Sequence, residues 1–299
     1  MPRMRNLGSV AFLALAWLSF AAPAQAQPLR IPPGGAAVDV PGAAPDGGPV
    51  TIWTYRPAGL EPTDRIVFVM HGVLRNADVY RDNWIRHAQA NRFLLVVPEM
   101  TRAQFPGDAG YNFGNMVERQ GGAAKPPAQW AWRSIEKVFD AVRTASGSQR
   151  QTYSIFGHSA GAQFVHRLVT YADNPRVDAA IAANAGWYTL PVFSESFPYG
   201  LTGSPASEER VRLNLQKPLV ILLGDQDTNP SDPNLRRDAG SDRQGKNRFE
   251  RGQFYVMTGA AEAMRLGVPF GWKTEIVPGV GHNNDGMSNA AVRWLFPKK

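Results

Sequence analysis

The sequence of 299 residues contains no cysteine. A chain without cysteine has no disulfide, no metal–thiolate site and no cysteine nucleophile, so its stability depends on packing alone. Charged residues make up only 19% of the chain, and no basic run alternates with aromatic residues, so nothing points to nucleic acid as a partner. The formal net charge is nevertheless +7, which favours anionic surfaces or polyanionic substrates through long-range attraction.

Long apolar runs are also scarce. One such run, Val10–Ala22, follows two arginines and precedes the small-residue pattern Ala24-Gln25-Ala26. It is shorter than the roughly 20 residues of a membrane-spanning helix, so it predicts a cleaved secretory signal peptide over residues 1–26 rather than an anchor. The remainder, residues 27–299, has the length of a single domain. We therefore expect an exported protein, periplasmic or extracellular, with no stable membrane insertion after cleavage.

The chain beyond an extended, Pro- and Gly-rich lead-in at Pro28–Gly48 alternates short apolar runs with longer amphipathic stretches. This alternation predicts an α/β fold, a mostly parallel central sheet with helices on both faces. The expected strands are Val50–Tyr55, Ile66–Met70, Phe93–Val97, Thr152–Phe156, Ala179–Ala183, Leu219–Leu223 and Thr274–Val277. The expected helices are Asp78–Ala90, Gln129–Thr144, Ala160–Ala172, Gly252–Leu266 and Ser288–Trp294. Three segments are expected to be long loops at the substrate-facing rim, namely Thr101–Pro127, Tyr188–Gln216 and Thr228–Arg251.

The pentapeptide Gly157-His158-Ser159-Ala160-Gly161 carries the strongest chemical signal. It follows the apolar run Tyr153–Phe156 and opens the helical pattern Gln163–Val169, which is the strand–turn–helix context of a nucleophile elbow. Two glycines and a serine at this spacing also occur by chance in Gly-rich chains, but the flanking elements favour the functional interpretation. We predict that Ser159 is a covalent nucleophile, which requires a base within hydrogen-bond reach.

Candidates for the base and its orienting acid follow in chain order. Two aspartates, Asp225 and Asp227, come directly after an apolar strand, and the Gly-x-x-Asp spacing favours Asp227, leaving Asp225 as a turn residue. His282 follows the last expected strand and is the expected base. The residues that a zinc site would need are not clustered, so we expect neither a metal nor a cofactor.

Acyl transfer also needs N–H donors for the oxyanion, and one is expected at Ala160, directly after the nucleophile. The run His71-Gly72-Val73 ends an early strand and predicts a second donor at Val73; the alternative is an ordinary turn. His71 is also a candidate substrate-binding residue. Trp187 follows another strand end and is either an aromatic wall for the substrate or a core tryptophan.

With Ser159, Asp227 and His282 in this order, together with His71-Gly72, the chain resembles the α/β-hydrolase superfamily. Segments such as Tyr111-Asn112-Phe113-Gly114-Asn115 are similar to those of secreted polyhydroxyalkanoate-depolymerase-like and feruloyl-esterase-like serine hydrolases. The resemblance implies an α/β-hydrolase fold and an esterase acting on a small-molecule or polymeric ester, such as a polyester or an aryl ester. A peptidase or a hydrolase of an acidic polyamide is the alternative, and an inactive binding protein on the same fold is a third.

Basic residues crowd the segment after the expected acid. They form either a solvated face or a surface that attracts a carboxylate-bearing or polyanionic substrate. These residues are Arg236, Arg237, Arg243, Lys246, Arg248 and Arg251.

Overall fold

The computed structural model of the chain describes residues 29–173 and 175–297. The predicted signal peptide, residues 1–26, lies outside the described residues. Within the described ranges, no helix combines the length and the apolar character that crossing a bilayer requires.

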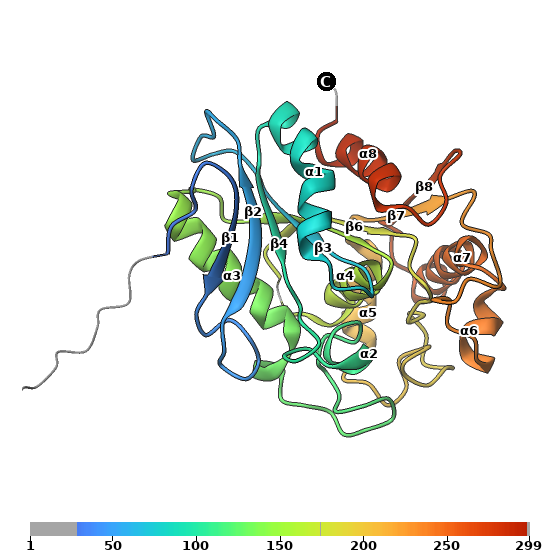
Figure 1. Ribbon diagram of the computed structural model, residues 1–299. Coiled ribbons are helices and arrows are strands. Elements are labelled where there is room, and N and C mark those ends of the chain that lie inside the picture. Colours follow the sequence, from blue (N-terminus) through green and yellow to red (C-terminus); the bar gives the residue numbers. More distant parts are fainter. Residues whose placement is uncertain (1–28, 174, 298–299) are drawn as a thin grey trace, which may run out of the picture.

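A single sheet of eight strands forms the centre of the described chain (Figure 1). The strands are β1 (Gly34–Val40), β2 (Val50–Arg56), β3 (Ile66–Met70), β4 (Leu94–Pro98), β5 (Tyr153–His158), β6 (Val177–Ala183), β7 (Leu219–Gly224) and β8 (Lys273–Val277). Their order across the sheet is β1-β2-β4-β3-β5-β6-β7-β8. Strands β3 to β8 are parallel, whereas β1 and β2 form an antiparallel edge. The expected mostly parallel sheet is confirmed.

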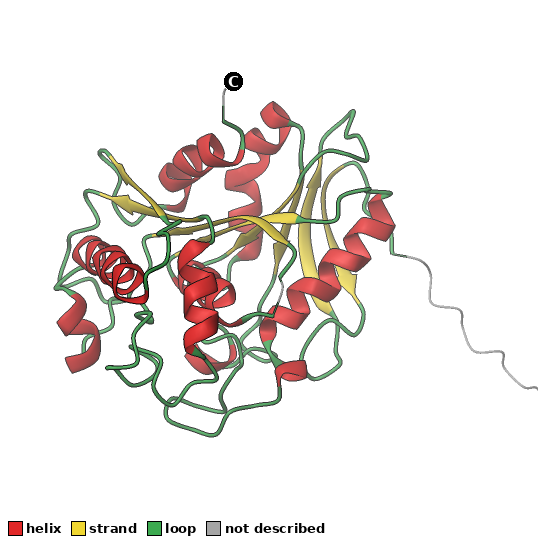
Figure 2. Cartoon of the chain, turned by 180° about the vertical axis from the view of Figure 1, so that it is seen from behind, coloured by secondary structure: helices red, strands yellow, loops and turns green. Residues whose placement is uncertain are grey.

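Helices cover both faces of this sheet (Figures 1 and 2). They are α1 (Ala77–Asn91), α2 (Gly107–Gly110), α3 (Ala131–Ser146), α4 (Ala160–Tyr171), α5 (Glu208–Gln216), α6 (Ala239–Gln244), α7 (Arg248–Leu266) and α8 (Asn284–Leu295), with a short 3₁₀ turn at Pro127–Gln129. Helices α1 and α8 pack on one face, and α3, α4, α5 and α7 pack on the other. The fold is therefore the expected α/β architecture.

The two faces of β3 show why these runs form central strands. Phe68 and Met70 pack into the core under α3 and α4, whereas Val67 and Val69 pack into the core under α1 and α8. A strand that is buried on both faces reads as a continuous apolar run, which is typical of parallel sheets. Helix α4 is buried along its whole length, so the β5–α4 junction lies at the centre of the molecule.

The extended lead-in expected at Pro28–Gly48 contains β1, a strand of the sheet that was not among the expected strands. Its sequence, GGAAVDV, contains only two β-branched residues, Val38 and Val40, and therefore has weak strand propensity. Backbone pairing with β2, from Gly34 opposite Arg56 to Val40 opposite Val50, makes it a strand. Tertiary pairing therefore overrides local propensity at this sheet edge.

The three segments expected as loops each contain a short helix, α2, α5 or α6. Ser207 caps α5 by accepting a hydrogen bond from the Arg210 N–H, and Glu208 lies in the first turn. Asp238 caps α6 through a reciprocal bond with Ser241. Both caps are start signals that can be recognised in the sequence, but the helices that they open are too short to show a clear apolar period.

Candidate active site

Ser159 lies in the sharp turn between β5 and α4, with φ of 59° and ψ of −116°. A positive φ is strained for a serine and is kept only where the surroundings enforce it. The flanking glycines permit this turn through close approach. A Cβ at Gly157 would lie 2.2 Å from the Gly161 carbonyl oxygen, and one at Gly161 would lie 2.1 Å from that of Met70. The turn therefore presents the serine hydroxyl beyond the carboxyl end of β5.

His282 lies between Ser159 and Asp227. Its Nε2 is 3.0 Å from the Ser159 Oγ, and its Nδ1 is 2.7 Å from the Asp227 Oδ2. Because an ionised carboxylate can only accept a hydrogen bond, Nδ1 carries the proton and Nε2 is free to accept the serine proton. The structure thus brings the three residues together in the geometry of a nucleophile, a base and an orienting acid.

The two aspartates that follow β7 have different partners. Asp227 is buried and contacts His282. The Asp225 carboxylate instead accepts hydrogen bonds from the Gly279 N–H at 2.8 Å and the Gln226 side-chain amide at 3.1 Å. The geometry therefore places Asp227 at the base and Asp225 in the adjoining turn.

The second carboxylate oxygen of Asp227 faces Arg248, at the start of α7. The Arg248 Nη1 lies 3.3 Å from Asp227 Oδ1 and 3.1 Å from Asp232 Oδ2, and the side chains of Arg248 and Asp227 are only 2% and 3% exposed. The Phe249 N–H donates to the backbone carbonyl of Asp227 at 3.3 Å. The first turn of α7 therefore holds both the loop and the carboxylate of Asp227.

The residues of the two expected oxyanion donors, Ala160 and Val73, border the same cavity as Ser159. Ala160 is the first residue of α4, where an amide has no acceptor within the helix. Val73 is 36% exposed and borders the same cavities as Ser159. Neither N–H bonds to another residue within the described ranges.

The expectation that His71 binds substrate is wrong. The side chain of His71 is fully buried, its Nδ1 bonds to the Gly72 carbonyl oxygen at 3.1 Å, and its Nε2 accepts the Met100 N–H at 3.0 Å. Burial, with a contribution from nearby Arg75, lowers the pKa of His71 to about 3. A neutral imidazole with both nitrogens bonded anchors the turn that carries Val73, without reaching the cavities.

His158, the residue before Ser159, packs against the base. Its ring centroid lies 4.6 Å from that of His282, and its Nδ1 pairs with the Tyr80 hydroxyl at 2.9 Å. Burial, followed by the proximity of His282 and Arg248, lowers the pKa of His158 well below its usual range. A neutral ring therefore supports one side of His282.

Two cavities meet at Ser159, and both are bordered by Ser159, Val73 and Asn234. The first, which we call the Trp187 cavity, has a volume of about 200 Å³ and is further lined by Asp108, Asn112, Ala160, Gln163, Gly186, Trp187, Pro233, Leu235, Arg236 and Arg248. The second, which we call the His282 cavity, has a volume of about 240 Å³ and is further lined by Gly72, Leu74, Asn76, Val79, Tyr80, Asn83, His158, His282, Asn283 and Asn284.

Only two of the three expected rim segments border these cavities. Thr101–Pro127 contributes to the Trp187 cavity and Thr228–Arg251 contributes to both, whereas no residue of Tyr188–Gln216 borders either. The segment Tyr188–Gln216, expected at the substrate-facing rim, therefore borders neither of the two cavities. Its Tyr199 packs behind Trp187, with the ring centroids 4.9 Å apart.

The comparisons with known proteins find hydrolases of similar sequence and structure. Poly(aspartic acid) hydrolase-1 from Sphingomonas sp. KT-1 is 41% identical, with a TM-score of 0.84 over 88% of this chain and 98% of that one. A poly(3-hydroxybutyrate) depolymerase from Bordetella parapertussis is 37% identical, with a TM-score of 0.83 over 89% of this chain and 90% of that one. The chain belongs to the α/β-hydrolase family. No family model matches it, and no curated protein does.

A siderophore hydrolase from Aspergillus nidulans shares the fold alone, at 13% identity and a TM-score of 0.52 over 93% of this chain and 98% of that one. The similarity to hydrolases and a depolymerase makes this protein an enzyme, a serine hydrolase of esterase-like or depolymerase type.

In this hydrolase Trp187 lies in the core and also borders the cavity beside Ser159. It is buried, at 2% exposed, and packs against Phe113 and Tyr199, yet it borders the Trp187 cavity. The Arg236 guanidinium carbon lies 5.1 Å from its ring centroid. Trp187 is thus a core residue with one surface on the cavity.

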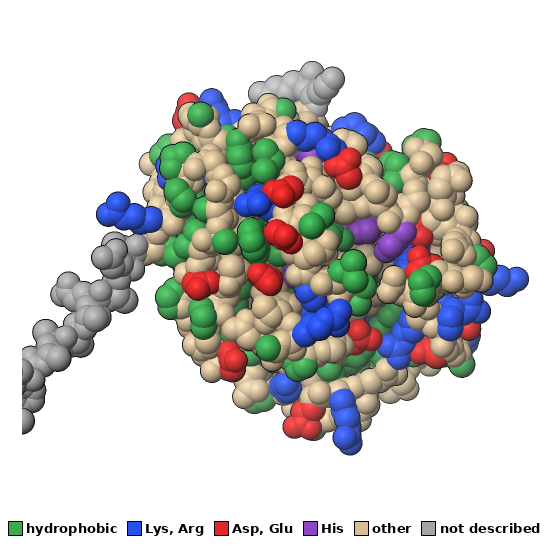
Figure 3. All heavy atoms as spheres, in the orientation of Figure 1, with side chains coloured by type: hydrophobic (Ala, Val, Ile, Leu, Met, Phe, Trp, Pro, Cys, Tyr) green, Lys and Arg blue, Asp and Glu red, His purple; other side chains and the backbone are tan. Residues whose placement is uncertain are grey.

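Most basic residues of the segment after Asp227 form ion pairs with acidic side chains, which neither expectation for this segment included. Arg248 and Arg251 are buried, which contradicts a solvated face at these positions. Arg236 contacts Asp238 at 2.6 Å and Asp108 at 3.2 Å. Figure 3 shows basic side chains near α6 and α7, mixed with acidic ones, and further basic side chains spread over the rest of this face. Other arginines of the segment form ion pairs with Asp242 and Glu195.

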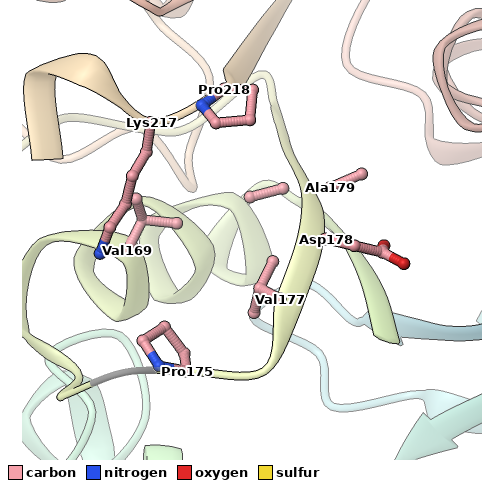
Figure 4. Close-up of a pocket in the computed structure, with 8 residues that line it drawn as sticks. Val169, Pro175, Val177, Asp178, Ala179, Lys217 and Pro218 are labelled. Atoms are coloured by element: carbon pink, nitrogen blue, oxygen red, sulfur yellow. The ribbon is translucent and has the colours of Figure 1, made fainter. Parts of the chain in front are cut away.

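A larger cavity, of about 290 Å³, lies at the amino ends of β6 and β7, the ends of the strands opposite to Ser159 (Figure 4). Asp178 borders it but points away from Lys217 in Figure 4, and its carboxylate bonds instead to Arg150, Thr152 and Ser154. No residue that borders this cavity is a serine, histidine or threonine. Size alone therefore does not identify the reactive site.

From the sequence, Arg248 is named only as one of several basic residues, and Gln163 and Asn284 are not singled out. Arg248 bonds to the acid from 21 positions further along the chain, and no local pattern marks that contact. Gln163 lies one helical turn after Ser159, and Asn284 lies two residues after His282, so both were within reach of a motif-based search. Within residues 29–173 and 175–297, no three His, Asp or Glu side chains cluster as metal ligands.

Proposed function

We propose that this enzyme hydrolyses carboxylic esters through an acyl-enzyme on Ser159, and that its natural substrate is an oligomeric or polymeric ester. The observation that carries the proposal is the continuous chain of hydrogen bonds from Ser159 through His282 to Asp227. In the first half-reaction the Ser159 Oγ attacks the carbonyl carbon while His282 Nε2 takes its proton. Asp227 then stabilises the resulting imidazolium.

The amides of Ala160 and Val73 would hold the carbonyl oxygen as it becomes an oxyanion. Collapse of this intermediate breaks the bond to the leaving alcohol, which takes the proton from His282 and leaves the acyl group on Ser159. Water then attacks the acyl-enzyme and gives its proton to His282. A second collapse releases the acid and returns the proton to Ser159.

Covalent labelling by a fluorophosphonate, which reacts with an activated serine, is the most direct test of this proposal. We expect a fluorophosphonate probe to label the wild-type protein and to leave Ser159→Ala unlabelled. Asp227→Asn should lower kcat by about 10⁴-fold because the imidazole then favours the wrong tautomer, whereas Asp225→Asn should retain most of the activity. Equal labelling of wild type and Ser159→Ala would refute the proposal.

A hydrolase of an acidic polyamide is the second candidate, and two observations favour it. The chain is 41% identical in sequence to a poly(aspartic acid) hydrolase, and Arg236 borders the Trp187 cavity. The pairing of Arg236 with Asp238 and Asp108 weighs against it, because these carboxylates already neutralise the guanidinium. Comparing nitrophenyl esters with aminoacyl nitroanilides, and then oligo(3-hydroxybutyrate) with oligo(aspartate), separates the two candidates; turnover of only the amides would favour the second.

We also propose that residues 1–26 direct export and are then removed. The support is the charged start, the short apolar run and the small residues before Gln27. N-terminal sequencing of the protein recovered from the periplasm and the medium should find Gln27 first. Recovery of uncleaved protein in the membrane fraction would contradict this.

A further inference from the structure

The two cavities that meet at Ser159 lie on chemically distinct sides of the nucleophile. His282 borders only the His282 cavity, and Ala160 borders only the Trp187 cavity. In the proposed reaction His282 gives its proton to the leaving group, so the leaving group must lie on the His282 side. The acyl group then occupies the side of Ala160 and Trp187.

The His282 cavity is rich in asparagine. Five of its thirteen bordering residues are asparagines, namely Asn76, Asn83, Asn234, Asn283 and Asn284. Asn283 uses its side-chain oxygen to cap α8, accepting the Gly286 N–H at 2.7 Å. The other four side-chain amides form no hydrogen bond to another residue in the described part of the chain.

Asn284 is the most unusual of these side chains. It is only 8% exposed, yet both its Oδ1 and its Nδ2 lack a hydrogen-bond partner among the described residues. A buried amide without partners is unfavourable for folding. The Nε2 of His158, on the same cavity, is also buried without a partner. Donors and acceptors are thus available here that the fold itself does not use.

The same cavity has no charged wall. Among the residues that the structure describes, no Lys, Arg, Asp or Glu borders it, whereas Asp108, Arg236 and Arg248 border the Trp187 cavity. Val73, Leu74 and Val79 supply exposed apolar surface beside the amides. Side-chain amides next to apolar groups suit a neutral unit that carries a carbonyl or hydroxyl group. A carboxylate placed here would be partly desolvated without a cation to pair with it.

We propose that the His282 cavity binds the leaving unit of an oligomeric substrate, that this unit is neutral and hydrogen-bonding, and that Asn284 determines the specificity for it. This inference rests on the proposed acyl-enzyme function. A polyester chain fits it, because cleavage within the chain leaves a unit whose own carboxyl group is still esterified and therefore uncharged. Cleavage next to a terminal free acid would place a carboxylate in the cavity and is disfavoured.

The test uses two substrates that share one acyl group. In the first, 3-hydroxybutanoyl is esterified to 3-hydroxybutanamide, a neutral leaving unit; in the second it is esterified to 3-hydroxybutanoate, the matching anion. We expect the wild-type enzyme to show a kcat/KM at least tenfold higher for the neutral substrate, with the difference mainly in KM. Asn284→Leu should reduce that preference to within about threefold, because the replacement lacks both polar atoms.

Gln163→Leu is the matched control, because it makes the same change of an amide to an apolar group on the Trp187 cavity. Since both substrates present the same acyl group there, it should alter both kcat/KM values by the same factor. Fluorophosphonate labelling counts the active enzyme in each preparation. If wild type is labelled and turns over both substrates equally, or if Asn284→Leu keeps the preference, this inference fails while the proposed function stands. If wild type is neither labelled nor active, both fail.

Discussion

At the scale of single residues, Arg248 is the side chain that we expect to hold the orienting acid. It is buried between Asp227 and Asp232, with its Nη1 3.3 Å from Asp227 Oδ1. Arg248→Met removes this partner, so the Asp227 carboxylate should be held less firmly against His282. We predict that kcat falls by roughly 10- to 100-fold, measured by steady-state kinetics on a nitrophenyl ester.

The same substitution leaves two carboxylates without their buried partner. Breaking such a pair typically costs about 3–5 kcal/mol, so urea unfolding should show a marked loss of stability. Arg248→Lys keeps the charge but loses the planar fork, and it should restore most of kcat while recovering only part of the stability. An unchanged kcat in Arg248→Met would show that the arginine contributes to stability alone.

At the scale of elements, the close packing at the β5–α4 elbow leads to a predicted effect of Gly161→Ala on stability that is opposite to the one expected from helix propensity. Alanine is favoured over glycine within a helix by about 1 kcal/mol, so Gly161→Ala would be stabilising on that ground. A Cβ at Gly161, however, would lie 2.1 Å from the carbonyl oxygen of Met70 and 2.9 Å from that of His71, and neither backbone can yield easily. We predict a loss of about 3 kcal/mol in the free energy of unfolding, measured in urea.

Gly281→Ala serves as the control for this effect, because the nearest atom to its added Cβ is 3.6 Å away, an ordinary contact distance. Its stability should stay close to that of wild type. A Gly161→Ala protein as stable as wild type would show that β3 and α4 can move apart, and that the elbow does not depend on their close approach.

The elements that could be predicted from the sequence are those whose signal is local. Buried parallel strands such as β3 and β7 are continuous apolar runs, and the elbow has its glycines within two residues of Ser159. In contrast, β1 depends on pairing with β2. The expected role of His71 failed because its position beside a strand end does not reveal that both its nitrogens bond to the backbone. The contact of Arg248 with Asp227 and the unpaired amide of Asn284 were not predicted, because such contacts and burial exist only in three dimensions.

At the scale of the whole molecule, buried histidines couple folding to pH. His71, His158 and His166 are all buried, and burial is the main cause that lowers the pKa of each below the usual value of 6.5. In the unfolded chain each binds a proton near pH 6.5, whereas in the folded protein each stays neutral. The unfolded state therefore binds more protons below pH 6.5, and stability falls as the pH falls.

We predict that the free energy of unfolding decreases between pH 6.5 and pH 5, and that each of these histidines contributes about 1.4 kcal/mol per pH unit. For His71, whose pKa is lowered to about 3, the loss continues down to that pH. Carboxylates with lowered pKa values, such as Asp140 and Asp232, act only near and below pH 4, so the window above pH 5 isolates the histidines. Urea titrations at pH 7, 6 and 5 measure the slope.

His166→Gln tests whether the slope comes from these residues. His166 bonds to the Ala162 carbonyl oxygen and accepts the Thr189 N–H, and a glutamine can also donate and accept at that position without titrating. The variant should be less stable at pH 7. Between pH 6.5 and pH 5, however, its free energy of unfolding should fall less steeply than that of wild type, by about 1.4 kcal/mol per pH unit, because one titrating group is removed. An unchanged slope would mean that His166 stays protonated in the folded protein or neutral in the unfolded one, and that acid sensitivity arises elsewhere in the chain.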